Sequence, residues 1–242
     1  MSLKGKHAFI TGCGKRLGRS MAEELLKHGM DISAHYRNSQ KEVHELQEWA
    51  QTNGLGQVLP IPADLRSSEA IKRAVEAATQ NLGPVDLLIN SASDFYPTPI
   101  GSVTTEIWDS LFELNLRAPF FLTQQIVKTM KPGANVIFIS DTHATKPIAK
   151  YAPYCATKAA LVSLSRSLAK ELSPDIRVNS ISPGTLLAQH GATQEETTRA
   201  AQRTLLGRIG CPNDLIQGLL FLIRSSYITG FDLVIDGGRG LL

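Results

Sequence analysis

The sequence predicts an α/β protein built on one doubly wound parallel sheet of about seven strands, with helices on both faces. Short apolar runs alternate with longer helical patterns along the whole chain of 242 residues, and this alternation indicates right-handed strand–helix–strand crossovers. The apolar runs lack polar alternation, which is typical of parallel strands buried on both faces. No linker, solenoid-type repeat or low-complexity segment interrupts the pattern, so we expect residues 1–242 to form a single domain.

The predicted elements follow from these runs in order. Strands are expected at 7–11, 31–36, 57–64, 85–90, 135–140, 176–182 and 232–236. Helices are expected at 15–29, 39–53, from a cap at Ser67 or Ser68 onward, and at 106–130, 151–172 and 212–225. The helix at 151–172 carries Ala160, Leu164, Leu168 and Leu172 at a spacing of four, which places them on one face. This order of elements is that of a Rossmann-type sheet.

Residues 183–211 show no clear element and are rich in glycine, threonine and glutamine. A stretch of this length inside a compact domain is more often a functional segment than a disordered insert. We therefore expect a substrate-binding lid at 185–210.

The bulk composition argues against several classes of partner. The net charge is +3, from 25 Lys and Arg against 22 Asp and Glu, and the basic residues are scattered, so we expect no nucleic-acid partner. The longest apolar run, 215–223, is about half the length that spans a bilayer. The N-terminus lacks the apolar region of a signal peptide, so a cytoplasmic protein without a membrane partner is expected. Three cysteines and six histidines show no disulfide or metal-ligand spacing.

The turn "TGCGKRLG", residues 11–18, follows the first strand and opens a helix. Glycines let a phosphate approach the backbone, and a helix N-terminus presents unpaired N–H groups to a pyrophosphate. The spacing of Gly12, Gly14 and Gly18 differs from G-x-G-x-x-G, and an ordinary strand–helix turn is the alternative. Its position after the first strand favours a dinucleotide site at the carboxyl ends of the strands.

The end of the second strand indicates which dinucleotide binds. NAD enzymes place an acid there for the ribose 2′-hydroxyl, whereas "HYRNSQ", residues 35–40, has Arg37 and no acid. An arginine pairs bidentately with a phosphate, and Ser39 with the start of the next helix adds donors. We therefore predict NADPH as the cofactor; the alternative for Arg37 is a solvated side chain at a strand end.

The segment "YCATK", residues 154–158, places a tyrosine and a lysine four residues apart on a predicted helix. Side chains at this spacing share a face, so the Lys158 ammonium would stand beside the Tyr154 phenol. A nearby cation favours tyrosinate and lowers the phenol pKa, which would make Tyr154 a proton donor or acceptor near working pH. Tyr151 has Cys155 four residues on and lacks such a partner.

Together these motifs resemble the short-chain dehydrogenase/reductase superfamily over essentially the whole chain. The landmarks are "TGCGKRLG", "ADL" at 63–65, "NSAS" at 90–93, "LNLRAP" at 114–119, "YCATK", "SPG" at 182–184 and "DGG" at 236–238. The resemblance implies a single-domain NAD(P)-dependent oxidoreductase that is usually tetrameric or dimeric, and we expect a homotetramer.

The family pattern also implies roles for individual residues. Asp64 would bind the adenine amino group, and Asn90 would lie along the adenosine ribose. Asn115 would order the active-site water or lysine, Lys158 would hold the nicotinamide ribose, and the backbone near Leu186 would meet the carboxamide. The predicted cofactor-binding set is Gly12, Arg16, Leu17, Gly18, Tyr36, Arg37, Asn38, Ser39, Asp64, Leu65, Asn90, Ser91, Ala92, Lys158, Pro183, Gly184 and Leu186.

Three departures from the common pattern indicate a subgroup. Arg16 replaces the second loop glycine, "NSASDFYPTP" replaces Asn-Asn-Ala-Gly, and Asp141 stands where a serine is usual, thirteen residues before the tyrosine. Ser140 is not expected to substitute, because adjacent strand residues face opposite ways. Pteridine reductases and the related dihydromonapterin reductases share these departures, and this chain resembles them at "GKRLGRS", "ASDFYPTP", "DTHATK" and "DGGRGLL". The alternative for Asp141 is a damaged active site.

This resemblance implies NADPH-dependent reduction of a pterin, such as dihydrobiopterin or dihydromonapterin, or of dihydrofolate. Phe95 would stack on one face of the flat ring opposite the nicotinamide, although it could also be a hydrophobic plug under its loop. Arg16 would bridge the cofactor phosphates and the pterin. Asp141 suits a C=N bond, whose nitrogen needs a proton. The predicted catalytic set is Asn115, Asp141, Tyr154 and Lys158, and the substrate-binding set is Arg16, Ser93, Phe95, Asp141 and Tyr154.

Two other functions remain as alternatives. One is a carbonyl reductase of the same superfamily, acting on a 3-oxoacyl thioester or a sugar; Asp141 and Phe95 argue against it. The other is an NADP-binding sensor without turnover, and the intact set of Tyr154, Lys158 and Asn115 argues against that. His143 is expected on the loop that leaves the fifth strand rather than in the catalytic machinery. Arg239 is expected to reach the site of a neighbouring subunit.

Overall fold

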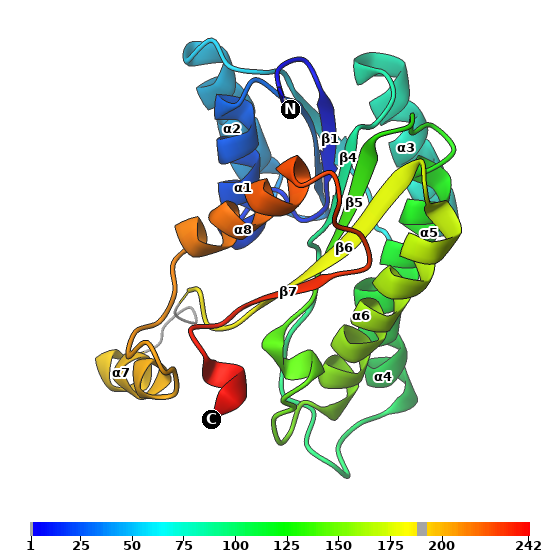
Figure 1. Cartoon of the computed structure of the whole chain (residues 1–242). Coiled ribbons are helices and arrows are strands. Elements are labelled where there is room, and N and C mark those ends of the chain that lie inside the picture. Colours follow the sequence, from blue (N-terminus) through cyan, green and yellow to red (C-terminus); the bar gives the residue numbers. More distant parts are fainter. Residues whose placement is uncertain (1, 188–192) are drawn as a thin grey trace.

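Seven parallel strands form one sheet in the order β3-β2-β1-β4-β5-β6-β7 (Figure 1). The computed structural model describes residues 2–187 and 193–242. The strands are β1 (His7–Ile10), β2 (Asp31–Tyr36), β3 (Val58–Pro62), β4 (Leu87–Asn90), β5 (Ala134–Ile139), β6 (Ile176–Pro183) and β7 (Asp232–Ile235). The predicted doubly wound sheet is confirmed, with every strand close to its expected bounds.

Helices cover both faces of the sheet, as strands without polar alternation require. One face carries α1 (Arg16–Lys27), α2 (Gln40–Thr52) and α8 (Pro212–Arg224), and the other carries α3 (Ser68–Leu82), α4 (Thr105–Phe112), α5 (Ala118–Ile126) and α6 (Ala152–Leu172). Each face closes its own core: Met21 and Leu215 pack in the first, and Ile71 and Leu161 in the second. Of the two predicted caps for α3, Ser67 is the one that accepts a backbone N–H.

The winding direction reverses at β1, which lies between β2 and β4. Such a reversal opens a crevice at the carboxyl ends of the strands, where ligands bind in open α/β sheets. The loops after β1 and β4 meet there, because the Thr11 hydroxyl oxygen accepts the N–H groups of Ser91 and Ala92 at 2.8 and 2.9 Å. Gly12 follows with a φ of +68°, and a Cβ on it would lie 3.1 Å from the Ala92 Cα. The topology therefore fixes where the candidate site lies.

The prediction of a single helix at 106–130 is wrong, because the helix is interrupted in its middle. The structure divides it into α4, a π-helical turn η1 (Glu113–Arg117) and α5. Pro119 lies in the first turn of α5, and because proline has no N–H it cannot bond the carbonyl four residues earlier. The chain can therefore widen into a π turn there, and the turn contains the buried side chain of Asn115.

The prediction that 183–211 holds no regular element is also wrong in part. Helix α7 (Gln194–Gln202) begins at a capping box, in which Thr193 and Glu196 bond each other's backbone N–H groups. The helix buries no residue against the core, so it gives no apolar period in the sequence. Residues 188–192 of the proposed lid lie outside the described residues.

A buried histidine joins the ends of β1, β2 and β3. His35 accepts the Gly12 N–H on Nδ1 at 3.2 Å and donates from Nε2 to the Ala63 carbonyl at 3.1 Å. These partners fix the neutral tautomer with its proton on Nε2, because an amide N–H only donates and a carbonyl only accepts. Burial lowers the pKa of His35 to about 4. Protonation would set a second donor against the Gly12 N–H and loosen the glycine-rich turn from β2.

We expect His35 to make the fold acid-sensitive. Its folded pKa of about 4 lies below the ordinary value of 6.5, so the stability is fully present above about pH 6.5 and is lost as the pH falls toward 4. The difference corresponds to about 3 kcal/mol. Urea unfolding at a series of pH values should show that His35→Asn, which keeps an acceptor but does not titrate, removes most of this loss.

The matched control is His44→Asn, at an exposed position of α2, which should leave the wild-type pH dependence intact. If His35→Asn and the wild type lose stability in parallel between pH 6.5 and 4, the assignment of the acid sensitivity to His35 is wrong.

Candidate active site

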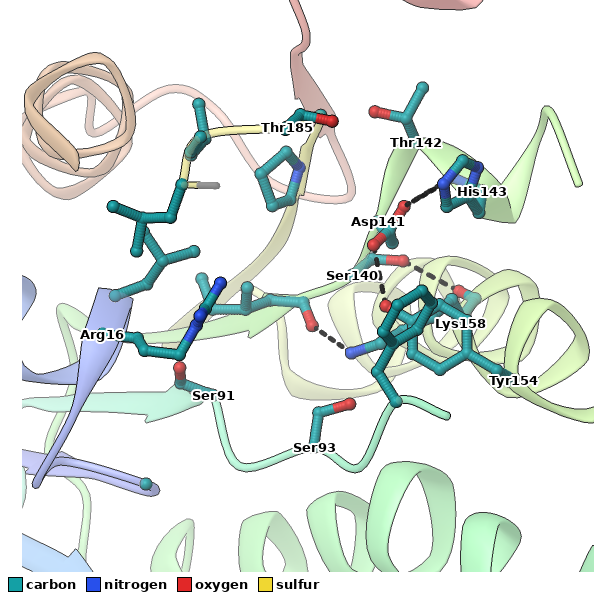
Figure 2. A pocket seen from close by; sticks show the side chains of 18 of the residues that line it. Arg16, Ser91, Ser93, Ser140, Asp141, Thr142, His143, Tyr154, Lys158 and Thr185 are labelled. Atoms are coloured by element: carbon teal, nitrogen blue, oxygen red, sulfur yellow. Dashed lines mark hydrogen bonds and ion pairs between the residues drawn. The ribbon is translucent and has the colours of Figure 1, made fainter. Parts of the chain in front are cut away.

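A cavity of about 660 Å³ opens at the carboxyl ends of β1, β4, β5 and β6 (Figure 2). A hollow of about 370 Å³ adjoins it, and both are lined by Gly12, Lys15, Ala92 and Ser93. The predicted residues that line the cavity are Gly12, Arg16, Leu17, Gly18, Ser91, Ala92, Ser93, Phe95, Asp141, Tyr154, Lys158, Pro183, Gly184 and Leu186. Those that line the hollow are Tyr36, Arg37, Asn38, Ser39, Asp64 and Leu65. The fold thus brings most of the predicted site together.

The glycine-rich turn and the start of α1 give the cavity an anion-binding end. Lys15 is the N-cap of α1 and provides no side-chain cap, and the first turn holds no acid. The N–H groups of this turn and the positive end of the helix dipole are therefore available to a ligand. A Cβ on Gly18 would lie 2.1 Å from the Gly12 carbonyl oxygen, so α1 can start this close to the turn only with glycine there. These features fit a dinucleotide pyrophosphate.

Arg16 opens α1 in a left-handed conformation, with a φ of +51°. That conformation costs a non-glycine residue on the order of 1–2 kcal/mol. Its side chain lies across the cavity from Tyr154 (Figure 2) and makes no hydrogen bond or ion pair with another residue in the described part of the chain. The guanidinium donors are therefore available to a ligand.

The adjoining hollow is built at the carboxyl ends of β2 and β3. Arg37 follows β2 directly, and its exposed guanidinium has no partner among residues 2–187 and 193–242. Ser39 is the N-cap of α2 without a side-chain cap of its own, so its hydroxyl and the first N–H groups of α2 face the same hollow. This end of the site fits an anionic group attached to a ribose.

Asn90 does not match its predicted role as a ribose contact. Its side chain is 3 % exposed and donates to the Thr123 hydroxyl of α5 at 3.2 Å, inside the helix layer. Neither the cavity nor the hollow is lined by it. Asn90 is the last residue of β4, and the strand pleat turns its side chain away from the crevice.

Tyr154, Asp141 and Lys158 meet between the end of β5 and the start of α6. The Tyr154 hydroxyl donates to Asp141 Oδ2 at 2.7 Å. Lys158 Nζ donates to the Ile139 carbonyl at 3.0 Å and lies 5.6 Å from the centre of the Tyr154 ring. Figure 2 shows the three side chains converging on one wall of the cavity. The predicted spacing on α6 is confirmed, and Ser140 instead donates to the Lys158 carbonyl at 2.9 Å.

Burial governs the protonation of this group. It raises the pKa of Tyr154 well above its ordinary value, and the Asp141 carboxylate raises it further. The prediction that Lys158 lowers this pKa is therefore wrong, and Tyr154 is a neutral phenol that can give a proton. Burial also lowers the pKa of Lys158 to about 8, although the charge of Asp141 acts in the opposite direction.

Asn115 holds the segment that follows β4. Its Oδ1 accepts the Asp94 N–H at 2.9 Å and the Ser93 hydroxyl at 3.2 Å, and its Nδ2 donates to the Asp94 carbonyl at 2.9 Å. Arg66 adds an ion pair to Asp94 at 2.9 Å. The family pattern implied that Asn115 orders Lys158, but the side chains of Asn115 and Lys158 form no hydrogen bond with each other. Asn115 instead positions the backbone from which Phe95 projects.

Phe95 lies in the cavity wall beside two tyrosines. Its ring stacks on Tyr151 with centroids 4.6 Å apart and meets the edge of Tyr154 at 4.7 Å. It is nevertheless 42 % exposed. Because Tyr151 covers one face of the ring, the exposed area leaves room for a planar ligand on the rest of it.

Several lining residues were not predicted from the sequence, among them Lys15, His143, Tyr151, Thr185 and Arg203. His143 lies on a short 3-10 turn, η2 (Thr142–Ala144), rather than on an open loop. The sequence signal that could have placed His143 near Asp141 was the spacing D-x-H directly after a strand. Arg239, on the turn η3 (Arg239–Leu241), lines the cavity of its own chain and donates to the Thr185 hydroxyl at 3.5 Å. Its expected reach to a neighbouring subunit stays a prediction.

Within the described ranges, no group of three or more His, Cys, Asp or Glu side chains is placed to hold a metal ion. In the same ranges, no helix combines the length and the apolar character that a membrane crossing requires.

A doubly wound sheet, a glycine-rich turn before an uncapped helix, and a tyrosine–lysine pair at the strand ends define a dinucleotide-dependent oxidoreductase. A family model described as enoyl-(acyl carrier protein) reductase matches residues 12–239. The chain belongs to the short-chain dehydrogenase/reductase superfamily and is an NAD(P)-dependent oxidoreductase.

Known proteins of similar sequence and structure span the whole chain. It is 34 % identical to dehydrogenase/reductase SDR family member 4 of Caenorhabditis elegans, over 97 % of this chain and 95 % of that protein. It is 33 % identical to L-xylulose reductase of Mus musculus, over 98 % of each. Among solved structures, a blue fluorescent protein from a metagenomic library in complex with NADPH superposes with a TM-score of 0.92 at 29 % identity, over 99 % of each chain.

Replacing Asp141 by asparagine should lower the pKa of Lys158 below about 8 and bring that of Tyr154 down, because the carboxylate raises both. Titration of ¹³C-labelled lysine and tyrosine by NMR is the measurement. Asp94→Asn is the matched control, since Asp94 pairs with Arg66 instead, and it should leave both titrations unchanged. If Asp141→Asn leaves the titration of Lys158 unchanged, the Asp141 carboxylate does not affect the pKa of Lys158.

Proposed function

We propose that the protein is a pteridine reductase, which uses NADPH to reduce the C=N bond of a dihydropterin such as dihydrobiopterin or dihydromonapterin, or of dihydrofolate. The supporting observation is the 2.7 Å hydrogen bond from the Tyr154 hydroxyl to Asp141 Oδ2 in the cavity. In the superfamily pattern that the chain resembles, position 141 is a serine. Here a hydroxyl donor has been exchanged for a carboxyl group, which can hold and pass a proton.

A C=N bond makes a different demand from a C=O bond. Reduction of a ketone builds negative charge on oxygen, which a hydroxyl donor stabilises, whereas reduction of an imine is complete only when nitrogen receives a proton. The bound reduced nicotinamide would supply hydride to the carbon. Tyr154 gives its proton to the nitrogen, and the Asp141 carboxylate then takes up a proton from solvent and passes it to the phenolate across their hydrogen bond. The positive charge of Lys158, near the ring, stabilises the phenolate meanwhile.

The cavity walls suit a flat polar bicycle. The exposed part of the Phe95 ring can stack on it, which contributes roughly 0.5–1.5 kcal/mol beyond burial. The Arg16 guanidinium faces the same space and can donate to the pterin carbonyl and ring nitrogens. The Ser93 hydroxyl donates to Asn115 and keeps lone pairs for the pterin amine. The three contacts together define the plane of the ring.

NADPH is the dinucleotide that the strand ends favour. Arg37 supplies a fork of donors for the 2′-phosphate, and Ser39 with the first turn of α2 supplies further donors. The turn at Gly12 and Gly18 holds the pyrophosphate. The similar blue fluorescent protein was solved with NADPH, which supports the same choice here.

A carbonyl reductase acting on a sugar or another ketone is the second candidate, and the comparisons favour it. The similar proteins include the L-xylulose reductase of Mus musculus and a D-erythrulose reductase of Gallus gallus. Identity of about a third over nearly the whole of each chain indicates the family and does not fix the substrate. Substrate choice depends on the residues around that pair, and in this chain Asp141 and Phe95 suit an imine in a flat ring.

Steady-state oxidation of NADPH separates the two candidates. With dihydrobiopterin, dihydromonapterin and dihydrofolate beside L-xylulose and a 3-oxoacyl thioester, we expect turnover of the pterins alone. Asp141→Ala should reduce pterin turnover by about 10²–10⁴-fold, because proton transfer is lost. Asp141→Ser should lose pterin turnover similarly and gain ketone turnover, because it restores the hydroxyl donor.

Glu113→Gln, on η1 and partly exposed beside Arg117, is the control for loss of an acidic side chain. Wild-type turnover of the sugar or thioester without turnover of any pterin would replace the proposed function by the second candidate.

Arg37→Ala should raise the Kd for NADPH by about 10–100-fold, because charged hydrogen bonds to the 2′-phosphate are worth about 1.5–3 kcal/mol. The Kd for NADH should stay the same. Nicotinamide fluorescence titration measures both. Lys41→Ala is the matched control, because Lys41 is an exposed cation on α2 that pairs with Glu45. If Arg37→Ala raises the Kd for NADH as much as the Kd for NADPH, Arg37 does not bind the 2′-phosphate.

A further inference from the structure

His143 faces the carboxylate oxygen of Asp141 that Tyr154 leaves free. Tyr154 bonds Oδ2, whereas Oδ1 accepts the His143 backbone N–H at 2.7 Å and lies 3.9 Å from His143 Nε2. Figure 2 shows Asp141 between the two side chains. The imidazole lines the cavity and is 15 % exposed, so it borders both the reacting group and the solvent.

The rest of the turn fixes which nitrogen of His143 faces Asp141. The Lys146 carbonyl lies 3.0 Å from Nδ1, and because a carbonyl only accepts, Nδ1 carries a proton. In the neutral ring Nε2 is then the unprotonated nitrogen, and it is the atom directed at Asp141 Oδ1. The orientation of His143 by a backbone acceptor leaves Nε2 as the atom that gains and loses a proton.

We propose that His143 relays protons from solvent to Asp141, and so resupplies the proton that each pterin reduction consumes. The inference rests on the proposed function and extends it to the source of the proton. After Tyr154 has given its proton to the substrate nitrogen, the Nε2–H bond of protonated His143 breaks as an O–H bond forms on the Asp141 carboxylate. That O–H bond breaks in turn as the phenolate takes the proton, which restores the Tyr154 phenol and the Asp141 carboxylate. The imidazole regains a proton from water, so one proton enters per hydride transferred.

The 3.9 Å separation is longer than a hydrogen bond. Closing it takes about 1 Å. Catalytic hydrogen bonds are often long without ligand and shorten in the complex. His143 therefore acts through Asp141 and does not itself touch the substrate.

The charges around His143 favour transfer toward the carboxylate. Asp141 faces it from its own turn and Lys146 from the following loop, and Tyr151, just before α6, with Tyr154 and Lys158 on α6 line the same cavity. Arg203 and Arg239 line the cavity from the segment after α7 and from η3. Asp141 is the only carboxylate that lines the cavity among the described residues, so it is the acceptor that a proton on His143 Nε2 can reach there.

The test compares wild type with His143→Gln and His143→Ala, with NADPH and dihydrobiopterin. We expect kcat to fall by about 10²-fold in both variants, with the Kd for NADPH unchanged. The solvent deuterium isotope effect on kcat should rise, because proton resupply becomes rate-limiting. Added imidazole should restore His143→Ala in a saturable way, which it would not do if the ring only supported the fold. His44→Gln, on the surface of α2, is the control and should match the wild type.

A measurement without turnover examines the same geometry. The ¹⁵N spectrum of histidine-labelled protein, assigned through His143→Gln, should show neutral His143 with its proton on Nδ1. A proton on Nε2 would overturn the relay. So would variants with wild-type kcat, wild-type isotope effect and no response to imidazole.

The relay and the proposed function fail in different ways. A wild type that reduces a ketone but no pterin refutes the pterin assignment. The relay is then judged on the ketone, because that reduction also consumes one proton: loss of kcat with imidazole rescue supports it, and unchanged kcat overturns it.

Discussion

The hydrogen bond between Tyr154 and Asp141 is the interaction on which the rest of the site depends. It joins the end of β5 to the start of α6, and Tyr154 is 4 % exposed there. In water such a bond would be exchanged with solvent, but inside a low-dielectric wall it fixes both the orientation and the protonation of the phenol. The same burial lowers the pKa of Lys158 to about 8. The site is therefore arranged to give a proton rather than to hold a tyrosinate.

The sheet keeps this bond in place from two sides. Lys158 Nζ bonds the Ile139 carbonyl, and Ser140 bonds the Lys158 carbonyl, so β5 and α6 are tied together on either side of the strand end. Farther along the crevice, His35 and Asn115 perform the same task for the glycine-rich turn and the segment after β4. Each tie uses a buried polar side chain with a backbone partner. The loops that carry the chemistry are thus fixed by the strand ends below them.

The sequence predicted those features that repeat along the chain and missed those that depend on loop paths. The strand Asp31–Tyr36 matches its prediction to the residue, because its apolar run is bounded by turns. The helix α7 was missed since it has no buried face. The orientations of Asn90 and His143 follow from the pleat and from a 3-10 turn, which spacing alone does not give. The shift in the pKa of Tyr154 had the wrong predicted direction because burial and Asp141 both raise it, and the spacing of the tyrosine and the lysine shows neither effect.

Three features of the cavity carry a cost that the superfamily pattern avoids. Arg16 adopts a left-handed φ of +51°, Phe95 leaves 42 % of an apolar ring exposed, and Asp141 places a carboxylate against a buried phenol. They come from the start of α1, the segment after β4 and the end of β5, and all three line the same cavity. Strained, exposed or charged groups persist where a ligand compensates for them. The proposed substrate, a flat, polar heterocycle that needs a proton, would compensate for all three at once, whereas a small open-chain ketone would use neither the ring face nor the carboxyl group.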